Sequence, residues 1–190
     1  RARLAEHPWS LSGGGAVDLL RRISDASLHQ LGSRVGSIGF AAITGEDAVF
    51  VSNGVAPGSW QRDNVPTRPF VEGDVVRDFA INGPSAAAFP YHGDQPIARL
   101  AHSVSFWPFR TNLRAGLAFG RTREDVGKAW FEYILPNWPR LLAERLIAFA
   151  FVATHNHFVL DRGGKVFNRS APVIKLPEGA SEDDHLALLG

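Results

Sequence analysis

The sequence predicts a mixed α/β fold of the α+β class, with short-stranded sheets and hairpins and several helices. The chain has 190 residues, of which 45% are hydrophobic and 21% are charged, and this composition is typical of one globular domain with a buried core. Several short strands alternate irregularly with helical patterns along the chain. Because no regular β-α-β alternation is visible, a Rossmann-like core is not expected.

The expected organisation is a single domain over 1–190. It comprises a helical lead-in over 1–35, a mixed α/β body over 36–177 and the start of a truncated C-terminal helix over 178–190. The chain starts with Arg1 and contains no methionine, which indicates a piece of a longer protein. No apolar run approaches the roughly 18 residues that a membrane span needs, so we expect a cytoplasmic protein without a membrane partner. Zero cysteines exclude disulfides and thiolate metal sites.

The first predicted element is a helix that follows Gly15 and ends at Gly32. Its apolar residues recur at roughly helical spacing; they are Val17, Leu19, Leu20, Ile23, Leu28 and Leu31. Two β-runs, Ile38–Ile43 and Ala48–Val51, are then joined by a predicted tight turn at residues 44–47.

The middle of the chain predicts shorter elements. Trp60–Thr67 is expected to be a loop, and short strands are expected at Val75–Ile81 and around Ala87–Tyr91. A helix within Pro96–Ala115 would be broken at Pro108. A second helix is predicted from Thr122 to Leu135, because Thr122 is a suitable N-cap and acidic residues follow it in the first turn.

The last third predicts strands and a final helix. The segment 141–153 is consistent with a helix that runs into a strand. His157–Leu160 and Lys165–Phe167 are predicted to pair as a β-hairpin across the Asp-Arg-Gly-Gly turn at 161–164. Another strand is expected at Pro172–Leu176. Ser181 is predicted to cap a helix that begins at about Asp183.

Charge is distributed unevenly along the chain. Residues 1–94 carry 8 basic and 10 acidic groups (net −2), residues 95–175 carry 12 and 5 (net +7), and residues 176–190 carry 0 and 4 (net −4), which sum to +1. A basic segment of this kind is the electrostatic pattern expected of a protein that contacts a polyanion. The alternative is that the arginines only solvate a surface while the interleaved aromatic residues form the core.

The candidate DNA-binding residues follow from this basic segment. We expect phosphate contacts from its cations and base-edge contacts from polar side chains near the predicted hairpin and the 44–47 turn. The phosphate candidates are Arg121, Arg123, Lys128, Lys165 and Arg169, and the remaining candidates are Thr44, His155, Asn156, Arg162 and Asn168.

His155 and His157 raise the alternative of a metal site, since alternate residues of a strand share one face. A zinc site needs three or four ligands. Asp161 and His185 are the available third ligands, but neither has a recognised spacing, so no metal is expected. No catalytic residue is predicted either. Asn137-Trp138-Pro139 is the closest approach to the Asn-Pro-Pro-aromatic motif of amino-methyltransferases, and it does not match.

Five segments in order resemble the target-recognition domains of N6-adenine DNA methyltransferases of the Eco57I and TaqI-like kind. They are GSIGFAAITGEDAVFV, RPFVEGDVVRDF, GKAWFEY, HNHFVLDRGGKVFNRSAPVIKLP and HLALLG. The order is most similar to the C-terminal region of PglX-like methyltransferases of phage growth limitation and BREX defence systems. The chain departs from the first motif at Phe40 and the two alanines before Thr44.

The resemblance implies that this chain supplies specificity and not chemistry. In such proteins a separate N-terminal domain binds S-adenosylmethionine, and it methylates an adenine flipped out of the duplex. No cofactor is therefore expected in this chain. The implied partners are double-stranded DNA, the protein's own N-terminal catalytic domain and other phage-defence subunits. The alternatives are a protein-interaction module that docks such subunits and, on His155 and His157, a metal-dependent nuclease.

Overall fold

The computed structural model describes residues 15–53 and 57–190, and the first fourteen residues of the predicted lead-in lie outside this range. The chain divides into two compact units, Arg1–Arg34 and Val35–Gly190. In the first unit α1 spans Ala16–Ala26 and a 3-10 turn spans Leu31–Ser33. The predicted helix is therefore confirmed in part: it ends at Ser27, which is extended, so that Leu28 and Leu31 lie outside it.

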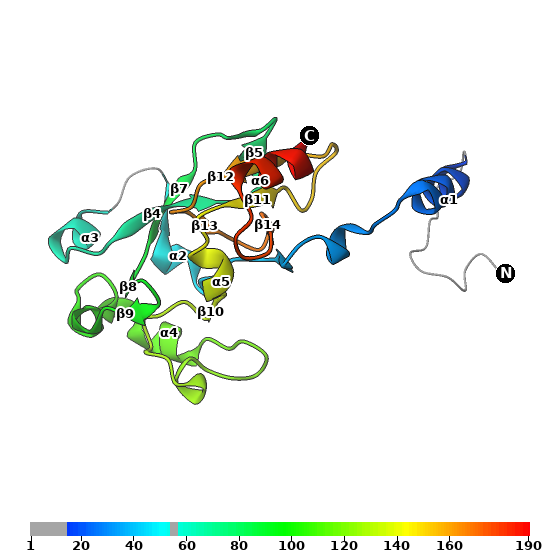
Figure 1. The fold of residues 1–190 in the computed structure, drawn as a ribbon. Helices are drawn as coiled ribbons and strands as arrows, with labels where there is room; N and C mark the ends of the chain where they lie inside the picture. Colours follow the sequence, from blue (N-terminus) through cyan, green and yellow to red (C-terminus); the bar gives the residue numbers. More distant parts are fainter. Residues whose placement is uncertain (1–14, 54–56) are drawn as a thin grey trace. The chain divides into compact units, whose positions relative to one another are not determined.

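The second unit contains two four-stranded sheets (Figure 1). All pairings in the first sheet are antiparallel, and its strands in spatial order are β1 Ser37–Gly39, β14 Val173–Lys175, β11 Leu146–Phe149 and β12 Phe158–Asp161. The second sheet is mixed, because β13 is parallel to β4. Its strands in spatial order are β13 Val166–Phe167, β4 Thr67–Val71, β7 Ser85–Ala88 and β3 Val51–Ser52.

Three two-stranded pairs and five short helices complete the unit. The pairs are β2 Ala42–Ile43 with β10 Leu135–Pro136, β5 Val76–Arg77 with β6 Ala80–Ile81, and β8 Tyr91–His92 with β9 Gln95–Pro96. The helices are α2 Asp47–Phe50, α3 Gly58–Arg62, α4 Arg110–Ala115, α5 Trp138–Leu141 and α6 Glu182–Leu189. Short 3-10 turns occupy Gly73–Val75, Ala98–His102, Trp107–Phe109 and Glu124–Val126. This architecture confirms the predicted α+β class.

No helix among the described residues has the length and apolar character that crossing a membrane requires.

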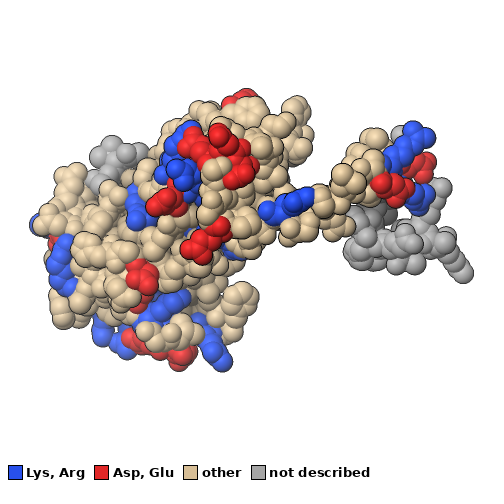
Figure 2. All heavy atoms as spheres, in the orientation of Figure 1, with Lys and Arg blue, Asp and Glu red and all other residues tan. Residues whose placement is uncertain are grey.

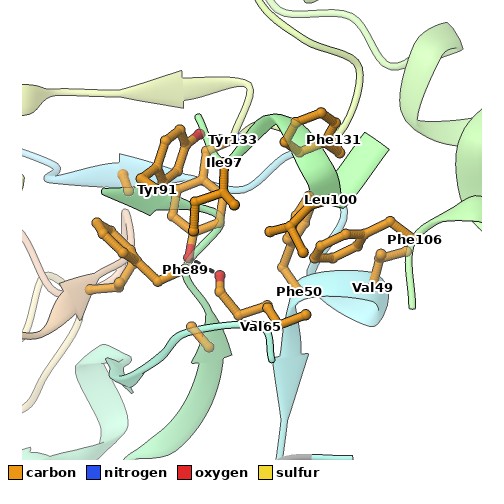
Figure 3. Packing of buried hydrophobic residues seen from close by; sticks show 14 of the residues in the cluster. Val49, Phe50, Val65, Phe89, Tyr91, Ile97, Leu100, Phe106, Phe131 and Tyr133 are labelled. Atoms are coloured by element: carbon orange, nitrogen blue, oxygen red, sulfur yellow. Dashed lines mark hydrogen bonds between the residues drawn. The ribbon is translucent and has the colours of Figure 1, made fainter. Parts of the chain in front are cut away.

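The largest core cluster is aromatic (Figure 3). Phe50 packs edge-to-face against Tyr133, with ring centroids 5.3 Å apart, and Tyr133 packs in the same way against Tyr91 at 5.4 Å. The Tyr91 hydroxyl accepts a hydrogen bond from the backbone N–H of Tyr133 at 2.6 Å, and the Tyr133 hydroxyl donates to the carbonyl of Ala88. These bonds satisfy polar atoms that burial would otherwise leave unpaired.

Two smaller clusters lie on the faces of the first sheet. Leu146 and Ala148 pack with residues of both sheets, including Val71 and Phe167, whereas Ile147 points to the opposite face. Helix α6 contacts β11 and β12 and contributes Leu189 to the packing on that second face. The predicted Ser181 cap is confirmed as a capping box, in which Ser181 and Asp184 exchange hydrogen bonds.

The predicted hairpin across the Asp-Arg-Gly-Gly turn is wrong. β12 pairs with β11, whereas β13 pairs with β4 in the other sheet, so the turn carries the chain from one sheet to the next. Gly163 and Gly164 both have positive φ, 81° and 77°. A side chain at Gly163 would place its Cβ 2.9 Å from the carbonyl oxygen of Ala143, so the crossing requires glycine there.

The helix predicted over Thr122–Leu135 is also wrong. Only the 3-10 turn at 124–126 forms, and Gly127, at φ 76°, ends it. The four residues Trp130, Phe131, Tyr133 and Ile134 are all buried. A surface helix can bury only one face, so such dense burial favours an irregular segment that passes through the core.

Two other expected elements change type. The predicted strand Ala48–Val51 is mostly the single helical turn α2, because the carbonyl of Glu46 accepts the N–H groups of Val49 and Phe50. The predicted loop Trp60–Thr67 begins inside α3, which buries Trp60. In both cases tertiary burial of a large apolar side chain selects the local structure. The expected strand over Pro172–Leu176 is confirmed as β14.

Candidate nucleic-acid interface

A pocket of about 310 Å³ brings two predicted site segments together, since residues 42–47 and residues 168–169 line it. Thr44 is buried, and its hydroxyl donates to the carboxylate of Asp47. The structure therefore corrects the prediction that Thr44 contacts DNA, because its side chain faces inward and is already bonded.

Asn168 and Arg169 form the opposite side of this pocket. The Asn168 amide donates to Glu72 at 3.3 Å, and its oxygen accepts from the backbone and hydroxyl of Ser170 at 2.8 and 2.6 Å. Burial raises the pKa of Glu72, and the charges of Asp74 and Asp47 raise it further. Glu72 thus lies beside Asn168, whereas Arg169 is exposed and is the one cation among the residues that line this pocket.

Arg123 is fully buried, at 0% exposure. Its guanidinium donates to three backbone carbonyls from separate segments: Glu132 at 2.6 Å, Thr44 at 2.8 Å and Leu113. Burial lowers the pKa of Arg123, and the nearby charges of Glu46 and Glu132 act in the opposite direction. The predicted phosphate contact of Arg123 does not fit this geometry, because its guanidinium is buried and three of its five N–H donors are bonded to carbonyls that hold the fold together.

Lys128 and Arg121 flank Arg123 in the sequence and differ in their surroundings. The Lys128 ammonium donates to the carbonyl of Ile134 at 2.7 Å, and burial lowers its pKa. Arg121 is exposed and closes a tight turn, in which it exchanges backbone hydrogen bonds with Ala118. Of these two candidates, Arg121 alone presents a side chain without a hydrogen bond or ion pair in the described part of the chain.

The cations of the Asp-Arg-Gly-Gly crossing are paired internally. Arg162 lies 2.6 Å from Glu182 of α6, which Arg145 also approaches at 3.4 Å. The hydrogen bond from Arg162 lowers the pKa of Glu182. Lys165 pairs with the buried carboxylate of Asp161. These ion pairs tie the crossing to the C-terminal helix and reduce its attraction for phosphate.

His155, Asn156 and His157 lie on the connection between β11 and β12. The two imidazole rings stack with centroids 6.4 Å apart, and His157 Nδ1 lies 3.4 Å from Asp78 Oδ1. Within residues 15–53 and 57–190, no group of three or more His, Cys, Asp or Glu side chains is placed to hold a metal ion. Asp161 and His185 are the side chains considered as a third ligand. Asp161 is paired with Lys165, and His185 is hydrogen-bonded to the carbonyl of Ser181.

The comparisons with known proteins agree with the order of motifs in the sequence. No family model matches the chain. It is 41% identical to the adenine-specific methyltransferase PglX of Streptomyces coelicolor, over 98% of its own length. The chain is therefore similar to one part of that methyltransferase. It spans about 16% of the length of that relative, which is therefore a much longer protein.

Charges are mixed on the surface of the chain. Figure 2 shows Lys and Arg interspersed with Asp and Glu over the face that is drawn. Of the ten predicted site residues, Arg121 and Arg169 are exposed cations without a side-chain ion pair or hydrogen bond in the described range, and His155 and Asn156 are exposed polar groups. Several cations of 95–175, such as Arg123, Lys128 and Arg140, are bonded to backbone carbonyls within the chain, which occupies their donors but leaves their positive charge in place.

Sequence reasoning missed two exposed aromatic side chains at turns. Phe79 lies in the turn between β5 and β6, although the sequence predicted one continuous strand there, and Phe119 lies in the turn between Ala118 and Arg121. The Phe119-Gly120 dipeptide, with glycine as the second turn residue, was the available signal for the latter. No comparable signal marks the turn at Asp78-Phe79.

Proposed function

We propose that this chain is a DNA target-recognition segment, which binds duplex DNA and supplies sequence selectivity to a separate S-adenosylmethionine-dependent domain that methylates adenine at N6. The observation that carries the proposal is the 41% identity to PglX along 98% of the chain, since that relative is an adenine-specific methyltransferase. On this proposal, phosphate contacts fix register and exposed polar side chains select the sequence.

The structure of Asn137 supports a non-catalytic role for this segment. Its side chain accepts the N–H of Arg140 at 3.3 Å and caps α5. An asparagine engaged as a helix cap is not available to bind the amino group of a target base. The catalytic domain is accordingly assigned to another part of the longer protein.

The burial and internal bonding of the candidate cations change the salt dependence that we expect for DNA binding. Five phosphate contacts would give a slope of log K against log salt of about −4.5. Arg123 is buried, and Lys128 and Lys165 are bonded internally, so two of the five predicted contacts remain. Two contacts give a slope of about −1.8.

Fluorescence anisotropy of a labelled duplex titrated with the 190-residue chain tests the proposal. We expect saturable binding that weakens as salt increases. Absence of binding, or an affinity that does not change with salt, would contradict it.

A second candidate function is a protein-interaction module, and exposed apolar side chains over residues 104–126 favour it. Val104, Trp107, Leu117, Phe119 and Val126 are all exposed, and two shallow pockets of about 310 and 320 Å³ lie among them. Large exposed apolar patches mark interaction sites on other proteins. This candidate predicts co-elution with another phage-defence subunit on size exclusion, and loss of co-elution in Phe119→Ser.

A further inference from the structure

Two phenylalanines are held at strained and exposed positions. Phe79 has φ 65° and is 70% exposed, and Phe119 has φ 51° and is 91% exposed. A bulky L-residue at positive φ is disfavoured sterically, and exposing its ring forgoes the gain from burial. Neither the local backbone nor the packing of the chain explains an aromatic side chain at these positions. Such strain concentrates at functional sites.

The turn that carries Phe79 contacts the connection between β11 and β12. The backbone N–H of Asp78 donates to His157 Nδ1 at 3.4 Å, and β12 contacts both β5 and β6. Figure 1 shows the β5–β6 turn and the β11–β12 connection next to each other at one end of the body. We call this pair of connections, residues 78–79 and 150–157, the double tip.

The double tip combines apolar and polar groups with little charge. Phe151 and Val152 are 69% and 85% exposed on the second connection, and His155 and Asn156 are exposed beside them. Its one carboxylate, that of Asp78, lies against His157, and it carries no Lys or Arg. A surface of this composition is poorly suited to phosphates. Aromatic faces and amide or imidazole edges instead match the faces and edges of bases.

We propose that the double tip enters a groove of duplex DNA, where Phe79 stacks against bases and Asn156 and His155 contact base edges. This inference rests on the proposed DNA-binding function and assigns its sequence-reading element. The major groove admits a two-stranded β-ribbon, and β5 and β6, which carry Phe79 in their turn, form an antiparallel pair of this kind. Apolar side chains inserted between base steps are a known means of local unstacking.

The test compares variants of the chain by anisotropy titration on one labelled duplex over a range of salt concentrations. Phe79→Ala should weaken binding by about fivefold or more, the effect of losing one stacked aromatic, while the slope against log salt stays unchanged. Phe79→Tyr should restore the affinity, because a tyrosine ring stacks equally well. Asn156→Ala, titrated in addition on duplexes of different sequence, should reduce the difference in affinity between them.

Phe119→Ala is the matched control, since Phe119 shares the exposure and positive φ of Phe79 but lies outside the double tip. Its affinity should stay within about twofold of the unsubstituted chain. Thermal melting of each variant reports its folding. If Phe79→Ala melts normally and binds as tightly as the unsubstituted chain, the double tip does not read DNA, although the proposed function stands. If the unsubstituted chain binds no duplex, the proposed function fails and this inference fails with it.

Discussion

The motif-bearing interior and the double tip differ in what their side chains do. In the interior, Thr44, Glu132 and Tyr133 belong to segments that carry the family resemblance, and all three are buried and hydrogen-bonded within the chain. In the double tip, Phe79, His155 and Asn156 point to solvent. Both groups of residues belong to segments that carry the family resemblance, so these segments combine residues that maintain the fold with exposed side chains on connections that are free to contact a ligand.

The segment RPFVEGDVVRDF, residues 68–79, contains both buried residues and an exposed one. Phe70 and Val71 fill the core, and Gly73 lies so close to Ser170 that an added Cβ would be 2.3 Å from its carbonyl oxygen. The same segment ends at Phe79, which is exposed. A motif read as one unit in the sequence therefore includes both structural residues and a residue that is open to a partner.

The largest expected effect comes from removing the buried guanidinium of Arg123. Arg123→Met would leave three buried carbonyls without their donor, and we expect the free energy of unfolding to fall by about 3 kcal/mol or more. Urea denaturation measures this change. Arg121→Met, two residues away and exposed, should stay within about 0.5 kcal/mol of the unsubstituted chain. Equal and small effects would show that Arg123 is not the link between the three segments.

A matched pair of glycines tests the packing around Arg123. Gly45 and Gly164 have similar positive φ, 84° and 77°, but a Cβ at Gly45 would lie 2.7 Å from Arg123 Nη2 and 2.8 Å from Ile134, whereas nothing lies within 4 Å at Gly164. Backbone strain destabilises both alanine variants. Overpacking should lower the free energy of unfolding of Gly45→Ala by about 1–3 kcal/mol more. Thermal melting measures the loss of stability in each variant. Equal losses in the two variants would contradict this packing.

A smaller effect concerns the pH dependence of the buried Glu132. Burial raises its pKa, and the N–H of Ala129 and the charges of Lys128 and Arg123 act in the opposite direction. The folded state therefore favours the protonated form of Glu132. Protonation contributes stability that is present below the ordinary pKa of 4.5 and is lost as the pH rises through the raised pKa. The stability of the unsubstituted chain relative to Glu132→Gln should therefore fall from acidic to neutral pH, as measured by denaturation at several pH values. Glu144→Gln is the exposed control and should show no such trend.

The sequence predicted the fold class, α1, β14 and the Ser181 cap, because each depends on local patterning or capping. It failed at Thr122–Leu135 and at the Asp-Arg-Gly-Gly crossing, where long-range contacts select the structure. The pairing of β13 with β4 joins residues almost a hundred positions apart, and no local signal marks such a partner.

The candidate site was predicted less well than the fold. Arg121, Arg169, His155 and Asn156 are exposed as a binding role requires, whereas Arg123 and Thr44 are buried. The sequence does not reveal whether a basic side chain is bonded inside the chain, since one carbonyl that accepts from Arg123, that of Thr44, lies 79 positions away. The exposure of Phe79 likewise depends on a turn that the strand pattern concealed.

The salt dependence of duplex binding tests the central claim most directly, namely that exposed cations on connections and not the buried Arg123 contact DNA. The measurement compares the unsubstituted chain with the double variant Arg121→Gln and Arg169→Gln by anisotropy titration over a series of salt concentrations. The account predicts a slope of about −1.8 for the unsubstituted chain, and a slope near zero for the double variant. Identical slopes for the two proteins would contradict it.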